Sequence, residues 1–196
     1  MLTCQFLKPD TTAKLSLNRL ITEQSFEIDN DGWGKLYSTE FGSDGNEISS
    51  FPNNPSFPGS MRSEITQEDS LSGNSSLKVT VTLNKGGDFK SFIIRQVPIT
   101  GNSITIYVKV PDLSGIHLSY MQLCIPSHDW ACSYGTRLQP GEWTPITIDL
   151  SQEDKQGVAL YNQKLTELAI QWKYTVERDK IFDLYFDSVI VTQAGR

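Results

Sequence analysis

From Ser25 onward the chain consists of short runs in which apolar and polar residues alternate, and Gly, Pro, Asn and Asp separate the runs. A period of two places successive side chains on opposite faces of a β-strand, so each run predicts a strand with one face toward a core. The runs are SFEI, GKLYSTEF, LKVTVTL, KSFIIRQV, SITIYVKV, HLSYMQLCI, ACSYGTRL, TPITIDL, LTELAIQW and KIFDLYFDSVIVT. Many short strands at this regular spacing predict an all-β antiparallel β-sandwich.

Two stretches depart from this pattern. Residues 1–24 carry no clean period and predict a linker remnant or an added edge strand, which leaves residues 25–193 as one domain. Residues 42–73 contain FPNNPSFPGS, and they predict a long irregular connection that is either functional or mobile. A chain of 196 residues buries roughly 70% of the surface that its unfolded form exposes, so no disulfide framework is needed for stability.

The run HLSYMQLCI and the run after the turn at 126–129 predict a hairpin with one polar and aromatic face. Cys124 and Cys132 share that face as cross-strand neighbours, and we expect them to form a disulfide; the alternative is two free thiols. A disulfide would indicate an oxidising compartment, and hence secretion. By the alternation, the other members of this face are Tyr120, Gln122, Trp130 and Tyr134.

The formal net charge is -6 and the isoelectric point is about 4.9. Nonspecific nucleic-acid affinity needs concentrated Lys and Arg, so we expect no nucleic-acid partner. No run approaches 18 apolar residues, and the N-terminus lacks the apolar core of a signal peptide. We therefore expect no membrane partner, and we expect a soluble monomer that is a piece of a longer secreted protein.

Four pieces occur in a characteristic order: FEIDNDGW, GNSSLKVTV, PGEWTPITIDLS, and LAIQW followed by IFDLYFDSVIVT. In this order they resemble the jelly-roll (galactose-binding-domain-like) carbohydrate-binding modules attached to polysaccharide-degrading enzymes, over about residues 25–193. The resemblance implies a jelly roll of two sheets with roughly four to five strands each. It also implies noncatalytic binding of a polysaccharide, which targets an attached glycoside hydrolase to its substrate.

Three carboxylates near the start of the domain raise a separate question. Glu27, Asp29 and Asp31 are two positions apart, so an extended chain would place them on one face, where repulsion favours a cation or a raised pKa. An EF-hand is excluded because Ser38 occupies the position of the closing bidentate Glu. The enzyme alternative is a jelly-roll glycanase or lyase that uses this cluster. Retaining hydrolysis, however, needs two carboxyl groups roughly 5 to 5.5 Å apart, and carboxyl groups at positions i and i+4 of an unbulged strand are farther apart than this. Binding is therefore favoured over catalysis.

The resemblance implies a different role for one of these residues. Related modules hold a structural calcium ion between the opening Glu and an Asp of the last strand, which correspond to Glu27 and Asp187. Asp29 and Asn30 are further candidate ligands. The alternatives are that Asp187 caps a backbone turn or pairs with a lysine, and that Glu27 is solvated.

A pyranose ring has a C–H face that stacks on aromatic rings and a hydroxyl rim that seeks amides and charged groups. The outward face of the predicted hairpin offers this mixture, with outward residues of LTELAIQW added from the same sheet. Trp172 is in phase with Leu168 and Ile170, which favours core packing over ligand stacking, and the phase of Arg95 stays open. The candidate ligand-binding residues are Trp130, Gln122, Tyr134, Gln171, Tyr120, Lys173, Arg95 and Trp172.

The net charge also bears on the choice of glycan. An acidic surface repels uronate-rich chains, so we expect a neutral β-glycan such as mannan, β-glucan, xylan or xyloglucan. A second alternative is a protein-interaction or adhesion module of the same fold, which would use the connection at residues 42–73.

Overall fold

The computed structural model describes residues 18–24, 32–96, 98–153, 157, 159–160 and 163–194. In this part of the chain the regular structure is almost entirely β-strand, with one short 3₁₀ turn, η1, at Pro126–His128. The described part contains no helix with the length and apolar character needed to cross a bilayer. The strands are β1 Asn18–Gln24, β2 Trp33–Phe41, β3 Glu47–Phe51, β4 Gly59–Thr66, β5 Ser76–Leu83, β6 Gly87–Arg95, β7 Ser103–Lys109, β8 Ile116–Ile125, β9 Ala131–Cys132, β10 Thr144–Asp149, β11 Leu168–Val176 and β12 Lys180–Ala194.

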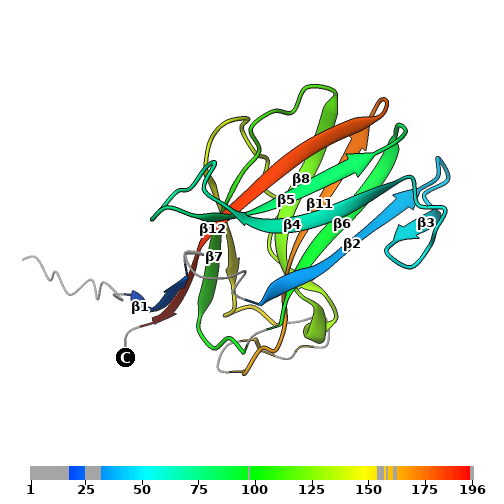
Figure 1. Ribbon diagram of the computed structural model, residues 1–196. Helices are drawn as coiled ribbons and strands as arrows, with labels where there is room; N and C mark the ends of the chain where they lie inside the picture. Colours follow the sequence, from blue (N-terminus) through cyan, green and yellow to red (C-terminus); the bar gives the residue numbers. More distant parts are fainter. Residues whose placement is uncertain are drawn as a thin grey trace, which may run out of the picture.

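The strands form two packed antiparallel sheets (Figure 1). The first, which we call the β12 sheet, has the order β10-β7-β12-β5-β4, with β1 added on β12. The second, the β11 sheet, has the order β3-β2-β6-β11-β8-β9. Most connections between consecutive strands cross from one sheet to the other, as in a jelly roll. The predicted all-β jelly-roll sandwich is confirmed, with six strands in each sheet where the sequence predicted four to five.

Residues 18–24 lie in the stretch for which the sequence predicted a linker remnant or an edge strand. They form β1, which pairs with the C-terminal part of β12 from Val189 to Ala194. The register shifts once, between Leu20 and Thr22. A domain boundary at residue 25 stays a prediction.

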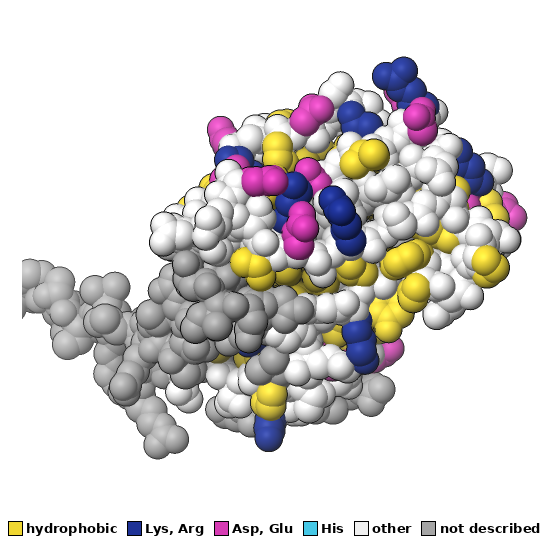
Figure 2. Space-filling view, in the orientation of Figure 1, with side chains coloured by type: hydrophobic (Ala, Val, Ile, Leu, Met, Phe, Trp, Pro, Cys, Tyr) yellow, Lys and Arg dark blue, Asp and Glu magenta, His cyan; other side chains and the backbone are white. Residues whose placement is uncertain are grey.

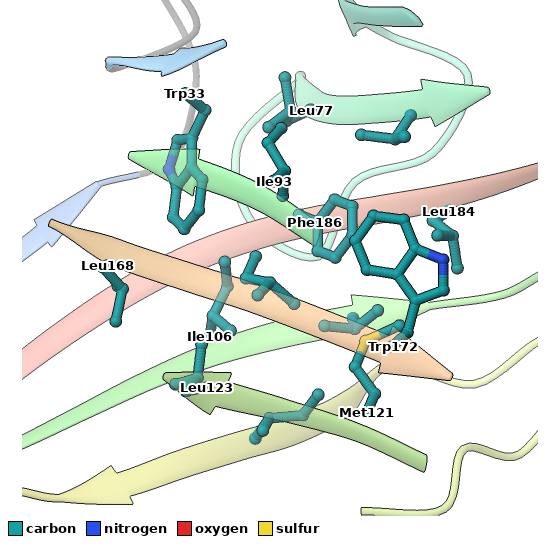
Figure 3. Close-up of a cluster of buried hydrophobic side chains, with 14 of the residues drawn as sticks. Trp33, Leu77, Ile93, Ile106, Met121, Leu123, Leu168, Trp172, Leu184 and Phe186 are labelled. Carbon is teal, nitrogen blue, oxygen red and sulfur yellow. The ribbon is translucent and has the colours of Figure 1, made fainter. Parts of the chain in front are cut away.

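The core fills the space between the two sheets (Figure 3). Strand β7 shows the cause: every second residue of SITIYVK is apolar, and Ile104, Ile106 and Val108 are all fully buried. Burial of one such side chain stabilises the fold by about 1.5–3 kcal/mol relative to leaving it in water. The two largest core residues are Trp33, at the start of β2, and Trp172, in β11.

The outer face of the β12 sheet carries a paired charge network. The Lys78 ammonium lies 2.6 Å from the Glu68 carboxylate and 3.5 Å from Asp183, and Tyr185 donates a hydrogen bond to Glu68 at 2.8 Å. Figure 2 shows this side of the molecule, with cationic and anionic side chains interspersed. Because the charges of both signs are interleaved and paired, the described residues of this face form no concentrated charge of one sign.

The prediction of one irregular connection over residues 42–73 is wrong, since β3 and β4 both lie within it. In β4 the residues Met61 and Ile65 alternate with polar neighbours, and Met61 is buried in the core. The Pro and Asn residues that suggested a loop are confined to the short turn between the two strands. That turn is anchored because Phe57 packs into the core and Gly59 sits where a Cβ would clash with the backbone of Thr82.

Candidate functional site

The outer face of the β11 sheet carries most of the residues that the sequence singled out. The antiparallel register of β2, β6, β11 and β8 aligns their outward side chains in rows across the sheet. We call this surface the binding face. Its central row contains Tyr37, Phe92, Gln171 and Gln122; the row on one side contains Ile94, Ala169 and Cys124, and the row on the other contains Thr39, Lys90, Lys173 and Tyr120.

A disulfide closes one end of the binding face. Cys124 of β8 and Cys132 of β9 are register partners, and their sulfur atoms are bonded at 2.07 Å. The predicted disulfide is therefore confirmed. Cys124 is fully buried beside Ile94 and Ala169, with Trp130 packed against this small cluster. The bond ties the segment that carries Trp130 to the sheet.

Trp130 lies on the short connection between η1 and β9. Both Asp129 and Trp130 adopt left-handed backbone conformations, with φ of 49° and 54°, and this turn directs the indole onto the sheet. The Trp130 ring meets Phe92 edge to face at 5.1 Å between centroids, and Phe92 stacks on Tyr37 at 4.9 Å. The three half-buried rings form a continuous surface, which we call the aromatic strip.

Sequence reasoning missed Tyr37 and Phe92. Phe92 is followed by Ile93 and Ile94, and this apolar run hid the period of two in β6. The signal that could have found it is Lys90, because a lysine two positions away marks the solvent-facing phase of the strand. Tyr37 alternates with Lys35 and Thr39 in the same way.

Two amide side chains lie next to the aromatic strip. Gln122 Nε2 donates a hydrogen bond to Gln171 Oε1 at 2.8 Å, so each amide fixes the other. Gln171 is buried between its neighbours, whereas Gln122 is partly exposed. Among the described residues, the two side-chain amides make no other hydrogen bond. Gln122 Oε1 can therefore accept a hydrogen bond from a ligand, and Gln171 Nε2 can donate one.

A groove of about 360 Å³ lies at the end of the binding face away from the disulfide. One wall is the turn between β2 and β3, and the floor consists of side chains from β6, β8 and β11. We call it the lysine groove. The floor residues are Asp88, Lys90, Tyr120 and Lys173.

Tyr120 is held in the lysine groove by the segment that follows β9. A Cβ at Gly135 would lie 2.9 Å from the Tyr120 Cβ, so only glycine lets the chain pass this close to the ring. The partial burial that results raises the pKa of the Tyr120 hydroxyl. A tyrosine hydroxyl is protonated at neutral pH even at its ordinary pKa of 10.0, so it can both donate and accept hydrogen bonds.

Tyr134 lies on the same segment, and its side chain is 96% exposed. The backbone around it is fixed to β8, because Ser133 N donates to Leu123 O at 2.8 Å and Thr136 N donates to Met121 O at 2.7 Å. The ring thus projects into solvent from an ordered backbone.

Two of the candidate ligand-binding residues point away from the binding face: Trp172, for which the core packing favoured by the sequence is confirmed, and Arg95, whose phase the sequence left open. Trp172 is fully buried between the sheets, where its ring lies 6.2 Å from that of Phe186 (Figure 3). Arg95 is 1% exposed and is in phase with the core residue Ile93. In both cases the alternation turns the side chain toward the sandwich interior rather than toward the binding face.

Of the four expected calcium ligands, Glu27, Asp29 and Asn30 lie outside the described residues, as does Asp31 of the alternative carboxylate cluster. Asp187 is fully buried in β12 and accepts backbone hydrogen bonds from three residues. Its Oδ2 bonds Leu71 N at 2.7 Å and Ser72 N at 3.0 Å, and its Oδ1 bonds Ser188 N at 2.6 Å. Within the described part of the chain, no group of three or more His, Cys, Asp or Glu residues is arranged to hold a metal ion.

No protein-family model and no curated protein matches this sequence. Solved structures do match. The chain is similar to carbohydrate-binding modules.

One of these is the xylan-binding domain CBM22-1 from Paenibacillus barcinonensis Xyn10C, at 14% identity and a TM-score of 0.49, over 91% of this chain and 97% of that one. Another is the mannan-recognising module TmCBM27, at 14% identity and a TM-score of 0.46, over 91% and 99%. A third is the C-terminal family 22 module of Clostridium thermocellum Xyn10B, at 12% identity and a TM-score of 0.46, over 90% and 95%. At these identities the likeness is one of fold.

Proposed function

We propose that this protein binds a polysaccharide chain on the binding face without altering it chemically. The observation that carries the proposal is the central row, in which the aromatic pair Tyr37 and Phe92 continues directly into the amide pair Gln171 and Gln122. Aromatic rings offer apolar surface to the C–H face of a sugar, and fixed amides offer donors and acceptors to its hydroxyl rim.

The dimensions of the row suit an extended ligand. Neighbouring strands are about 4.8 Å apart, so four strands span about 14 Å from the first side chain of the row to the last. Trp130 extends the aromatic surface toward the disulfide, and the lysine groove extends the face in the other direction. A surface of this length contacts more than one ring of a chain, so we infer that the ligand is an oligosaccharide or polysaccharide rather than a single sugar.

Binding rather than hydrolysis is supported by the acid groups of the site. Glycoside hydrolysis by the common mechanisms uses two carboxyl groups on either side of the scissile bond. In the described part of the lysine groove the carboxylate is Asp88, and it already accepts a hydrogen bond from Thr175 at 2.5 Å. We infer further that the module is secreted, since the disulfide suits an oxidising compartment, and that it targets an attached glycoside hydrolase.

A structural calcium ion belongs to the same proposal. The buried carboxylate of Asp187 already accepts three backbone hydrogen bonds, but its oxygens are hard donors of the kind that Ca²⁺ takes, and Glu27, Asp29 and Asn30 would supply the other ligands. Bound Ca²⁺ would add a cationic link between the start and the end of the domain. A thermal transition that does not change between EDTA and millimolar Ca²⁺ would contradict this part of the proposal.

The test of binding is affinity electrophoresis in gels that contain mannan, β-glucan, xylan, xyloglucan or an acidic polysaccharide. We expect retardation of the wild type by at least one polymer and loss of that retardation in Trp130→Ala, because the aromatic strip is shortened. Trp143→Ala is the matched control, since Trp143 is also half-buried but precedes β10 of the other sheet. Full retardation of Trp130→Ala, or equal loss in both variants, would refute the assignment of the binding face.

A further inference from the structure

Two lysines face each other on the floor of the lysine groove. Lys90 of β6 and Lys173 of β11 are direct register partners on the outer side of the sheet. Side chains paired in this way start about 4.5–5.5 Å apart at their Cβ atoms, and like charges at such a position destabilise a sheet. This arrangement needs a reason, because an acidic or neutral residue at either position would remove the repulsion.

Neither ammonium group is neutralised by a residue in the described part of the chain. Among the described residues, no carboxylate forms an ion pair with Lys90 or Lys173. The other face of the molecule behaves differently, since Lys78 is paired with Glu68 and Lys109 with Asp69, both at 2.6 Å. Lys35 and Lys164 also have no ion pair among the described residues, so what distinguishes Lys90 and Lys173 is that two unpaired lysines face each other across paired strands.

Two acids in or beside the groove accept hydrogen bonds from groups other than the lysines. Asp88 accepts the hydroxyl of Thr175 at 2.5 Å. Asp44, in the turn that forms the groove wall, accepts Asn46 N at 3.0 Å and Asn46 Nδ2 at 2.9 Å. The groove thus offers two free cationic donors on a protein whose net charge is -6.

Neutral hydrogen-bonding groups surround the lysine pair. Tyr120 is the register partner of Lys173 on β8, and its protonated hydroxyl can donate and accept hydrogen bonds. Gln122 and Gln171 lie one row away and present the acceptor and donor described above. A carboxylate or sulfate held by both ammonium groups would therefore belong to a ring whose hydroxyl rim reaches Tyr120 and the amides.

We infer that the lysine groove binds an anionic substituent, carboxylate or sulfate, on a sugar ring of the bound polysaccharide. This inference rests on the proposed function and replaces the neutral glycan expected from the net charge. Net charge describes the whole surface, whereas a substituent in the groove interacts with the nearest charges, because fields from charges farther away than about 8 Å are screened at physiological salt. The ligand class is accordingly a uronate-containing or sulfated glycan.

The experiment compares matched polymers that differ only in the anionic group. Polygalacturonate is paired with its carboxyl-reduced form, alginate with its carboxyl-reduced form, and dextran sulfate with dextran, all by affinity electrophoresis at low and high NaCl. The acidic member of at least one pair should retard the wild type at least tenfold more strongly than its neutral partner, and added salt should weaken this difference. The pair that responds distinguishes a uronate from a sulfate.

The double variant Lys90→Gln/Lys173→Gln should lose this preference while its thermal transition stays unchanged or rises, because a repulsive pair is removed. Lys164→Gln/Arg178→Gln is the charge-matched control, since both residues are exposed and lie outside the binding face. A purely nonspecific charge effect would weaken both double variants equally, and it would overturn the inference.

The other outcomes are also decisive. Equal binding of the acidic and neutral members, or a preference that survives in Lys90→Gln/Lys173→Gln, would overturn the inference and leave polysaccharide binding in place. Retardation by neutral polymers alone would also overturn the inference and leave polysaccharide binding in place. If no acidic or neutral polymer retards the wild type, both the inference and the proposed function fail.

Discussion

Phe92 and Phe89 provide a matched pair of substitutions on one strand. Phe92 faces outward from β6 and is the central ring of the aromatic strip, whereas Phe89 faces the core and is fully buried. Phe92 contacts Tyr37 and Trp130, and each aromatic pair contributes about 0.5–1.5 kcal/mol beyond burial. These two contacts amount to about 1–3 kcal/mol, and we expect Phe92→Ala to lower the free energy of unfolding by at least this amount, because some burial of the half-exposed ring is lost as well.

Phe89→Ala should cost more because it opens a cavity. The Phe89 ring stacks on Tyr174 at 5.6 Å and meets Phe57 edge to face at 6.0 Å. Truncation of a fully buried Phe costs about 3–5 kcal/mol. In a chain of this size 1 kcal/mol shifts the thermal midpoint by about 2–4 °C, so Phe89→Ala should melt roughly 6–20 °C lower than the wild type and Phe92→Ala at least about 2–12 °C lower.

The assay measures both properties for each variant. Differential scanning calorimetry gives the midpoint, and affinity electrophoresis below that midpoint gives retardation by the polysaccharide that binds the wild type. We expect Phe92→Ala to lose retardation with the smaller change in midpoint, and Phe89→Ala to keep retardation with the larger change. Retardation that survives in Phe92→Ala, or that depends on Phe89 instead, would show that the aromatic strip is not the ligand platform.

Two further predictions concern the disulfide and the charge network. Cys124→Ala/Cys132→Ala should lower the free energy of unfolding by about 2–3 kcal/mol in urea titrations, because the short loop is no longer closed. It should also weaken glycan retention, because the segment that carries Trp130 is released. Unchanged retention would show that Trp130 is positioned without the disulfide. The hydrogen bonds from Lys78 and Tyr185 lower the pKa of Glu68, so its stabilising effect is present above the ordinary pKa of 4.5 and is lost as pH falls through the lower folded value. Thermal midpoints measured from pH 7 to pH 2 should fall less steeply in Glu68→Gln than in the wild type, and parallel profiles would contradict this role.

The sequence predicted the β11 sheet well where polar and apolar residues alternate cleanly. In β8 the residues Tyr120, Gln122 and Cys124 lie on the outer face as expected, and the alternation also placed Cys132 beside Cys124. The period of two is sufficient there because one face of the strand is covered by the core and the other is polar.

The failures have a common physical cause. A run that is apolar at successive positions, such as Phe92, Ile93 and Ile94, does not show which residues face the core and which face outward. The outward position of Phe92 and the inward position of Arg95 follow only from the register with neighbouring strands. The lysine pair was hidden for the same reason, because Lys90 and Lys173 are 83 positions apart in sequence and meet only through the pairing of β6 with β11. Local charge at a site depends on such pairing and cannot be obtained from net charge.

The central claim is that the ligand lies on the outer face of the β11 sheet. Backbone amide chemical shifts, recorded while a soluble fragment of the binding polysaccharide is titrated into isotope-labelled protein, test it most directly. The account predicts that the shift changes concentrate at Phe92, Gln122, Gln171 and Lys173. Changes concentrated instead around the cavity of about 540 Å³ at Ser114 and residues 177–180, or on the outer face of the β12 sheet around Lys78, would contradict it.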